Sequence, residues 1–342
     1  MTGWVANGMD AAVKWQLGTL PVELPGEDRF GATHAGEFWA QSRIHQSAPS
    51  MTLGPILARR NRGRVEVHDL EAPSSGPGNH PGSRKLMATV HMRSHRRDMP
   101  FVLVVHGFAV PVAWWEERQC RTLTNRGAHA ARIDQPFHLR RRVRKQRSGD
   151  GYLGPDLGRT RAAVRQAVED CAAVVAWARE NVSDQVSVLG VSLGGLVACL
   201  LAAHVELDAL VAVAPFCDPP RTFMENSPMR IRRILGLTEG SGGVWGDDQR
   251  TAQQVLDAAL APIVPRNFTP ATSPDRITLI RPERDTVVGP EPIAELAATW
   301  GTELWDLRHG HISVMNARGL SNRMHERLIH PQRREAGMRL AG

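Results

Sequence analysis

The chain is poor in cysteine and in aromatic residues. Its four cysteines, Cys120, Cys171, Cys199 and Cys217, lie far apart and lack the spacing of a metal site, and two of them fall in predicted apolar helices. We therefore expect reduced thiols in the core. Aromatic residues make up 5% of the sequence and include a single tyrosine, Tyr152, so few side chains are available for base stacking. This scarcity argues against a protein that binds nucleic acid.

The sequence also lacks targeting and membrane signals. The N-terminal stretch contains Asp10 and no basic start followed by an apolar block, so no secretory signal is predicted. The longest apolar region, residues 196–216, is interrupted by His204, Glu206 and Asp208 and is not expected to span a membrane. No glycine-rich phosphate loop and no internal repeat is present. We therefore expect a cytoplasmic protein without a nucleotide cofactor or a metal.

What the chain has in excess is positive charge. Its formal net charge is +7 and its isoelectric point is about 10.0, which favours contact with polyanions at low salt. A solvated loop is the favoured interpretation of each basic run, and a patch that binds an anionic partner is the alternative. The two runs are Arg59, Arg60, Arg62 and Arg64, and Arg140, Arg141, Arg142, Arg144, Lys145 and Arg147.

The composition is that of a folded protein with room for a sizeable core. The chain has 342 residues, of which 42% are hydrophobic and 23% charged. We divide it into an N-terminal extension (1–62), with one or two short helices within 36–60, an α/β domain (63–332) and a C-terminal tail (333–342). Residues 215–270 are rich in proline and show no strand signal, which predicts a helical cap inserted into the domain.

Strand and helix patterns alternate from residue 101 onward, which predicts a mostly parallel sheet covered by helices. An antiparallel hairpin, 64–70 and 85–92, is expected before it. The helix after Asp156 has the clearest pattern, because apolar residues recur there at helical spacing and Arg165 and Glu169 pair along it. The other predicted strands are 101–105, 128–133, 185–192, 208–214, 276–280 and 303–307, and the other predicted helices are 114–125, 196–203, 251–260, 292–300 and one from about 312.

The motif around which the chain is organised is Gly190-Val191-Ser192-Leu193-Gly194-Gly195. A β-branched apolar run precedes it and a run rich in leucine and alanine follows it, so the serine lies at a turn from strand to helix. In that context G-x-S-x-G is typical of a nucleophile elbow, which lifts the serine hydroxyl above the sheet in a strained backbone conformation. Gly190 and Gly194 are expected to remove Cβ atoms that would clash there. A chance glycine-rich turn is the alternative.

A serine hydroxyl needs a base to take its proton and a carboxylate to orient that base. Asp285 follows the predicted strand 276–280 and is our candidate acid, with Glu283 as the alternative. His311 follows the strand 303–307 and is our candidate base, with His309 as the alternative. All of them lie past strand ends at the edge that also carries Ser192, where ligands bind in open α/β sheets.

The oxyanion of a tetrahedral intermediate needs two N–H donors. Leu193, directly after the serine, is expected to supply one at the start of a helix, where the helix dipole assists. The second donor is assigned to the N–H of Phe108, in the loop His106-Gly107-Phe108 that follows the strand 101–105. His106 itself is interpreted as a residue that orders this loop.

Together these motifs resemble the α/β-hydrolase-fold superfamily. The matching elements occur in the order of that fold and span about residues 101–318. They are His106-Gly107-Phe108, the motif 190–195, Asp285 with Val287-Val288, and Gly310-His311.

The resemblance implies an eight-stranded sheet whose second strand is antiparallel, with helices on both faces. It also implies a triad of Ser192, Asp285 and His311 and a cap after the sixth strand. Pro136-Phe137-His138, with arginines nearby, is similar to a less characterised bacterial group of the superfamily. The basic run at 140–147 and the long N-terminus depart from a minimal member.

The sequence therefore predicts a serine hydrolase that acts on a carboxylic ester or related acyl bond through an acyl-enzyme. We expect its partner to be a small acyl substrate, and anionic or lipid-like molecules are among the candidates. A thioesterase, peptidase or acyltransferase would use the same residues. The alternative from another class is a non-catalytic protein of this fold whose basic surface binds anionic lipid or nucleic acid. The oligomeric state does not follow from the sequence.

Overall fold

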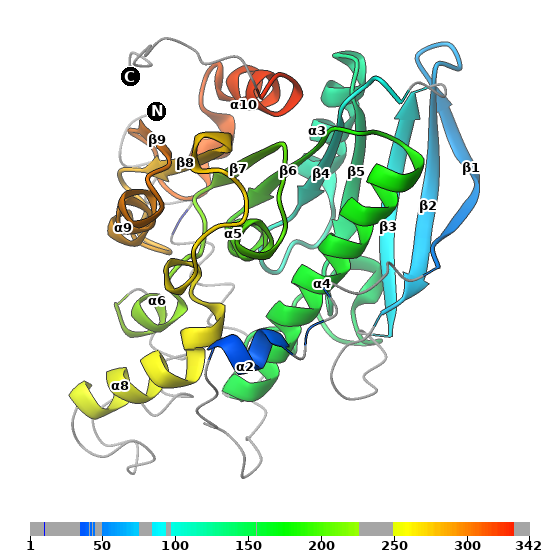
Figure 1. Cartoon of the computed structure of the whole chain (residues 1–342). Helices are drawn as coiled ribbons and strands as arrows, with labels where there is room; N and C mark the ends of the chain where they lie inside the picture. The colour runs from blue at the N-terminus through cyan, green and yellow to red at the C-terminus, as the bar shows by residue number, and fades with distance from the viewer. Residues whose placement is uncertain are drawn as a thin grey trace.

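The computed structural model describes residues 10, 35–40, 42, 44, 50–74, 84–93, 97–154, 156–225 and 249–331. Within them the chain forms one nine-stranded sheet with helices on both faces (Figure 1). The strands lie in the order β1-β2-β3-β5-β4-β6-β7-β8-β9, and β1 and β3 run opposite to the others. The strands are β1 Thr52–Arg60, β2 Val65–Pro73, β3 Lys85–Arg93, β4 Phe101–Val105, β5 His129–Asp134, β6 Val186–Val191, β7 Ala209–Val213, β8 Ile277–Pro282 and β9 Glu303–Leu307.

The central strands are parallel and confirm the predicted alternation. β5, β4, β6, β7, β8 and β9 pair in parallel, and β4 and β9 begin and end at the predicted residues. All five residues of β4 are buried because both faces of the sheet are covered. The predicted hairpin is also confirmed, since β2 and β3 pair antiparallel from Val65 with Arg93 to Pro73 with Lys85.

The sheet has nine strands where eight were expected, and the additional strand lies at its edge. Residues 52–60 form β1, where the sequence pattern favoured helix, and only α2 (Ala35–Ala40) is helical in that region of the described chain. Gly54 and Pro55 hide the strand pattern, because they interrupt the alternation at a point where the register with β2 shifts. An edge strand tolerates a proline at such an irregularity. Asn61, with φ 52°, and Arg62, with φ 56°, form the tight turn into β2.

Two layers of helices bury the two faces of the sheet (Figure 1). One face packs on α4 (Leu157–Asn181), α5 (Leu193–His204) and α9 (Glu291–Trp300), and the other packs on α3 (Trp114–Asn125) and α10 (Leu320–Ile329). The start of α4 is capped, because the Asp156 carboxylate accepts the Arg159 N–H at 2.9 Å. The predicted pair of Arg165 and Glu169 is present at 3.8 Å. The four cysteines are buried and free, as expected.

Helix α2 of the extension and the described helices of the expected cap lie together at one end of the molecule, whereas β1 lies at the edge of the sheet (Figure 1). Trp39 of α2 donates from its indole to the Pro262 carbonyl at 2.8 Å, and its ring stacks on His204. The region expected as a cap contains α6 (Pro219–Glu225) and α8 (Gln249–Leu260). Residues 226–248 of the cap, most of the extension and the tail 333–342 lie outside the described residues. None of the described helices combines the length and apolar character that a membrane span needs.

Short 3₁₀ turns complete the described chain. One of them follows β5, and one precedes α10 where a continuous helix from about residue 312 was expected. They are Leu139–Arg141, Ala261–Ile263, Pro265–Asn267, Pro274–Arg276 and Ser313–Asn316.

Candidate active site

Ser192 lies at a strained turn between β6 and α5. Its backbone angles are φ 53° and ψ −115°, a conformation that L-residues rarely adopt. A Cβ atom on Gly190 would overlap the carbonyl oxygen of Gly194, and one on Gly194 would overlap the carbonyl oxygens at the end of β4. The expected clashes are therefore confirmed, and glycine at these two positions lets the strand, the helix and the neighbouring strand approach closely.

The side chains of Ser192, His311 and Asp285 form a chain of short hydrogen bonds. His311 Nε2 lies 2.9 Å from Ser192 Oγ, and His311 Nδ1 lies 2.7 Å from Asp285 Oδ2. His311 and Asp285 are 3% and 4% exposed, so both are shielded from water. Because an ionised carboxylate only accepts hydrogen bonds, the Nδ1 atom carries the ring proton and Nε2 is free to accept the serine hydroxyl.

Asp285 is held by the residues that follow it. Its Oδ1 atom accepts the N–H groups of Val287 at 2.9 Å and Val288 at 3.0 Å, which leaves Oδ2 for His311. The alternative acid, Glu283, is half-exposed and lies 3.8 Å from Arg308. The alternative base, His309, has no contact with Ser192 among the described residues, and burial lowers its pKa. Of the alternatives weighed from the sequence, the structure brings Asp285 and His311 to the serine.

Opposing effects set the protonation of His311. Burial by itself would lower the pKa of the imidazole, because a charge is poorly solvated in the interior. The carboxylates of Asp285 and Asp10 outweigh this effect and raise the pKa of His311 above its ordinary value of 6.5. The surroundings of His311 therefore stabilise the imidazolium form of its ring.

The loop after β4 lies against the serine. A Cβ atom on Gly107 would stand 3.5 Å from Ser192 Cβ, so this position is in van der Waals contact with the nucleophile elbow. The N–H groups of Phe108 and Leu193 have no acceptor among the residues that the structure describes. Two unpaired donors beside a serine hydroxyl are what an oxyanion site requires.

Two buried histidines hold this loop. His106 Nε2 accepts the Gln135 N–H at 3.0 Å, while its Nδ1 atom donates to the Gly107 carbonyl at 2.7 Å. His138 Nε2 accepts the Ala109 N–H at 3.1 Å, while its Nδ1 atom donates to the Pro136 carbonyl at 2.8 Å. Both patterns require the neutral ring, and burial lowers the pKa of each histidine accordingly. The expected loop-ordering role of His106 agrees with these contacts.

His138 is the loop contact that sequence reasoning missed. Ala109 has a φ of 56°, which is strained for a residue with a Cβ atom, and its N–H is fixed by His138. Gly149 closes over the pair, since a Cβ atom there would come 2.9 Å from His138 Nε2. The available signal was the unusual Pro136-Phe137-His138 motif after β5, which we noted without assigning a role.

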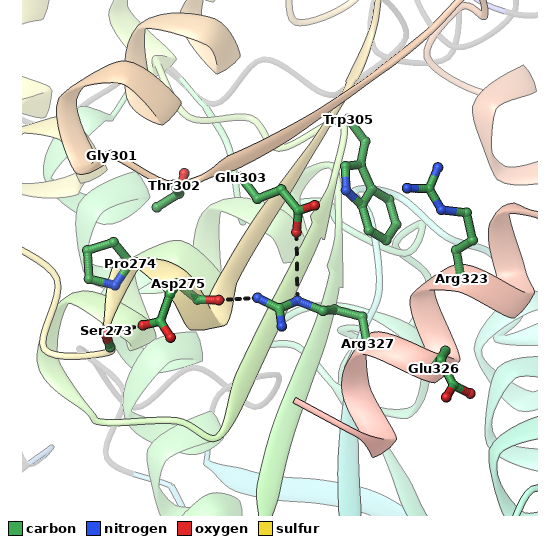
Figure 2. A pocket seen from close by; sticks show the side chains of 10 residues that line it. All are labelled: Ser273, Pro274, Asp275, Gly301, Thr302, Glu303, Trp305, Arg323, Glu326 and Arg327. Carbon is green, nitrogen blue, oxygen red and sulfur yellow. Dashed lines mark hydrogen bonds and ion pairs between the residues drawn. The ribbon is translucent and has the colours of Figure 1, made fainter. Parts of the chain in front are cut away.

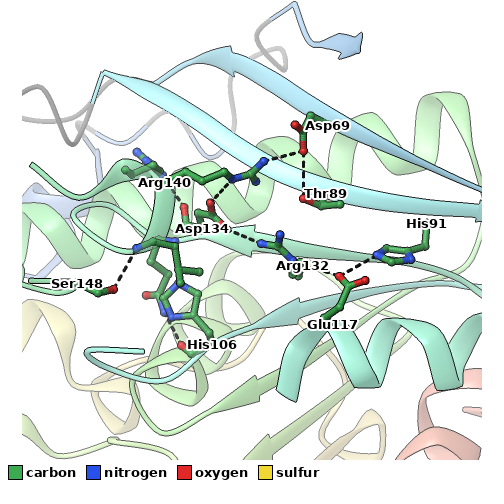
Figure 3. Close-up of polar contacts among 12 residues, drawn as sticks. Asp69, Thr89, His91, His106, Glu117, Arg132, Asp134, Arg140 and Ser148 are labelled. Carbon is green, nitrogen blue, oxygen red and sulfur yellow. Dashed lines mark hydrogen bonds and ion pairs between the residues drawn. The ribbon is translucent and has the colours of Figure 1, made fainter. Parts of the chain in front are cut away.

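The basic run after β5 is partly structural, which corrects the choice between a solvated loop and a binding patch. Arg140 lies between two carboxylates, 2.6 Å from Asp69 and 2.5 Å from Asp134 (Figure 3). Arg141 is buried and lies 2.7 Å from Asp170 on α4. Arg140 thus joins two strands and Arg141 joins the loop to α4, whereas Arg142, Arg144, Lys145 and Arg147 remain exposed.

A pocket of about 600 Å³ lies at the opposite end of β8 and β9 from the serine (Figure 2). It is lined by 273–275 before β8, by 301–302 before β9, by Glu303 and Trp305 of β9 itself, and by side chains of α10. Arg323 stacks on Trp305 there, 4.0 Å from the ring centre. Because the pocket borders the amino ends of these strands, it is not part of the candidate active site.

Within the described part of the chain, no group of three or more His, Cys, Asp or Glu side chains is arranged to hold a metal ion. Aromatic side chains after β4 and β7 differ in exposure. Trp114 is 65% exposed, whereas Phe216 and Phe223 are buried and contact each other edge to face.

Comparisons with known proteins agree with this architecture. Residues 98–241 match a family model described as serine aminopeptidase, S33. No curated protein matches the chain in a sequence comparison.

Solved structures resemble the chain over most of its length. Acetyl xylan esterase 1 from Thermoanaerobacterium sp. JW/SL YS485 is 16% identical, with a TM-score of 0.63 over 93% of this chain and 98% of that one. An acetyl xylan esterase from Paenibacillus sp. R4 is 14% identical, with a TM-score of 0.65 over 92% of this chain and 99% of that one. An esterase from Pyrococcus furiosus is 18% identical, with a TM-score of 0.51 over 81% of this chain and 98% of that one. From its sheet, its elbow and these likenesses, the chain is a protein of the α/β-hydrolase fold.

Proposed function

We propose that this protein is a serine hydrolase that cleaves carboxylic esters through an acyl-enzyme. The observation that carries the proposal is the chain of hydrogen bonds from Asp285 through His311 to Ser192, 2.7 Å and 2.9 Å long, beside the unpaired N–H groups of Phe108 and Leu193. A serine hydroxyl bonded to a histidine, with two N–H donors left without an acceptor in the adjoining segments, suits attack on a carbonyl carbon.

In the proposed reaction Ser192 Oγ attacks the ester carbonyl while its proton passes to His311 Nε2. Asp285 keeps the ring oriented and stabilises the imidazolium, and the N–H groups of Phe108 and Leu193 bind the oxyanion. Collapse breaks the bond to the alcohol oxygen, which takes the proton from His311. Water then attacks the acyl-enzyme with the same proton transfers, releases the carboxylic acid and restores Ser192.

Short acyl esters are the first substrates to test. Two of the similar structures bear the name acetyl xylan esterase, which supports a small acyl group on a sugar hydroxyl as a candidate substrate. The family model described as a serine aminopeptidase supports a peptide bond as the second candidate. Both reactions begin with attack by the same serine, so the substrate screen decides between them.

The proposal is tested by covalent labelling. The wild-type protein is treated with a fluorophosphonate probe, digested, and the labelled peptide identified by mass spectrometry. We expect the label on Ser192, together with hydrolysis of p-nitrophenyl acetate. A series of longer acyl chains, acetylated xylan and an aminoacyl arylamide then rank the substrates. A folded protein that takes up no label and hydrolyses none of these compounds would overturn the proposal.

The pH dependence should follow the protonation of His311. The histidine must be neutral to accept the serine proton, and its pKa is raised above 6.5. Activity is therefore lost as the pH falls through this raised pKa, and the acid limb of the kcat/KM profile should be centred above pH 6.5. The profile is measured with a neutral aryl acetate. An acid limb centred well below pH 6.5 would contradict the assignment.

His138 should affect the rate of hydrolysis, because it holds the loop after β4 that carries the proposed oxyanion donor Phe108. His138→Asn removes the acceptor for the Ala109 N–H, and we expect kcat to fall by about 10²-fold, the scale of losing one oxyanion donor. His138→Gln places an amide oxygen near the former Nε2 atom and should restore part of the rate. Steady-state kinetics of the two variants, with thermal unfolding as a check on folding, make the comparison. Equal rates for both would argue against this role.

A further inference from the structure

The carboxylate of Asp10, in the N-terminal extension, contacts the backbone of the loops that carry the candidate triad. Asp10 is fully buried, and its Oδ2 atom accepts the backbone N–H of His311 at 3.2 Å and that of Thr286 at 3.2 Å. The same oxygen accepts the Thr286 hydroxyl at 3.3 Å, and Oδ1 accepts the Ile312 N–H at 3.3 Å. Asp10 lies 301 positions before His311 in the chain.

These contacts connect the two loops on which the site depends. Thr286 directly follows the candidate acid Asp285 in the loop after β8, and His311 and Ile312 lie in the loop after β9. One carboxylate therefore bridges the acid loop to the base loop. All four of its partners are donors, so this arrangement suits the ionised carboxylate, which only accepts hydrogen bonds.

We propose that Asp10 is a positioning residue for the candidate triad, which aligns the acid and base loops and places a second negative charge close to His311. This inference rests on the proposed function only for its kinetic consequence. The hydrogen bonds of Asp10 go to Thr286, His311 and Ile312, so it acts through the loops that carry Asp285 and His311.

The charge of Asp10 matters because Asp10 and His311 are both buried. Among the described residues, the charged groups that act on His311 are Asp285, at the ring itself, and Asp10, at the backbone of the same residue. Both raise the pKa of the imidazole against the effect of burial. Interactions between charges are stronger in a water-poor interior than at the surface, so Asp10 should help to stabilise the imidazolium of the transition state.

The competing explanation is that Asp10 only holds the two loops together by hydrogen bonds and that its charge has no effect. Two substitutions distinguish this explanation from the proposal. Asp10→Asn keeps the size of the side chain and one oxygen acceptor but removes the charge. Asp10→Ala removes both the charge and all four hydrogen bonds. Asp306→Asn is the matched control, because Asp306 is an exposed carboxylate on β9 that pairs with Arg281 away from His311.

The first measurement is a titration of the His311 ring by NMR, with its resonance assigned by comparison with His311→Gln. We expect the pKa of His311 to fall in Asp10→Asn and to stay unchanged in Asp306→Asn. The second measurement is the pH profile of kcat/KM, whose acid limb should move to lower pH in Asp10→Asn. In Asp10→Ala we expect kcat to fall by about 10²-fold with KM little changed, as for a small misplacement of reacting groups.

The outcomes are separable. An unchanged pKa of His311 in a folded Asp10→Asn protein overturns the inference, whatever the activity. If Asp10→Ala fails to fold, Asp10→Asn still decides the question because it keeps the shape of the site. Should the wild type neither label nor hydrolyse esters while Asp10→Asn lowers the pKa of His311, the proposed function fails and the placement of Asp10 stands.

Discussion

Replacing Ser192 with alanine is expected to abolish fluorophosphonate labelling and to lower kcat for p-nitrophenyl acetate by about 10⁶-fold, the scale found when a triad serine is removed. Among the described residues, Ser192 Oγ is the hydroxyl that lies within hydrogen-bonding distance of His311 Nε2, at 2.9 Å. Without it the histidine has no hydroxyl to deprotonate and no acyl-enzyme can form. The residual rate would come from substrate binding and the oxyanion donors.

A matched control lies on the same strand. Ser187 is a buried serine of β6 whose hydroxyl donates to the Leu328 carbonyl at 2.9 Å, away from His311. Ser187→Ala should retain labelling and keep kcat within a few-fold of wild type. Labelling that persists in Ser192→Ala would show that another residue reacts with the probe, and the assignment of the nucleophile would be wrong.

The parts of the site that sequence reasoning found share one property: each follows a strand that the local sequence predicts. Phe101 to Val105 is a continuous apolar run, and Glu303 to Leu307 precedes Gly310-His311 at a recognisable boundary. In a parallel sheet the carboxyl ends of strands meet at one edge, so local strand predictions already bring Ser192, Asp285 and His311 together. The order of the motifs along the chain then indicated which residue is the candidate nucleophile, which the acid and which the base.

The parts that were missed depend on contacts between distant segments. Asp10 carries no local pattern, and its contacts with the loops after β8 and β9 join residues that lie far apart in the sequence. His138 was visible as part of a motif, but its role follows from the strained backbone of Ala109 in another loop. Arg141 stood in a basic run, and only the fold places it beside Asp170. Such contacts are tertiary, and periodicity does not encode them.

Asp285→Asn is the second substitution with a large expected effect, and it tests the role of the charge with little change in shape. The asparagine oxygen can still accept the hydrogen bonds from the N–H groups of Val287 and Val288, which donate to Asp285 Oδ1 at 2.9 and 3.0 Å. The amide nitrogen then replaces Oδ2 and faces His311 Nδ1 as a donor. The ring must move its proton to Nε2, where it can no longer accept the proton of Ser192.

We expect kcat to fall by about 10⁴-fold in Asp285→Asn, the scale reported for a triad that is forced into the wrong tautomer. KM and the unfolding temperature should change little, because the side chain keeps its size and its backbone contacts. Glu283→Gln is the matched control, since this half-exposed carboxylate lies beside Arg308 and not beside His311. If Glu283→Gln caused the large loss and Asp285→Asn did not, the acid would be Glu283. The hydrogen bond of 2.7 Å between Asp285 and His311 would then have no part in the rate.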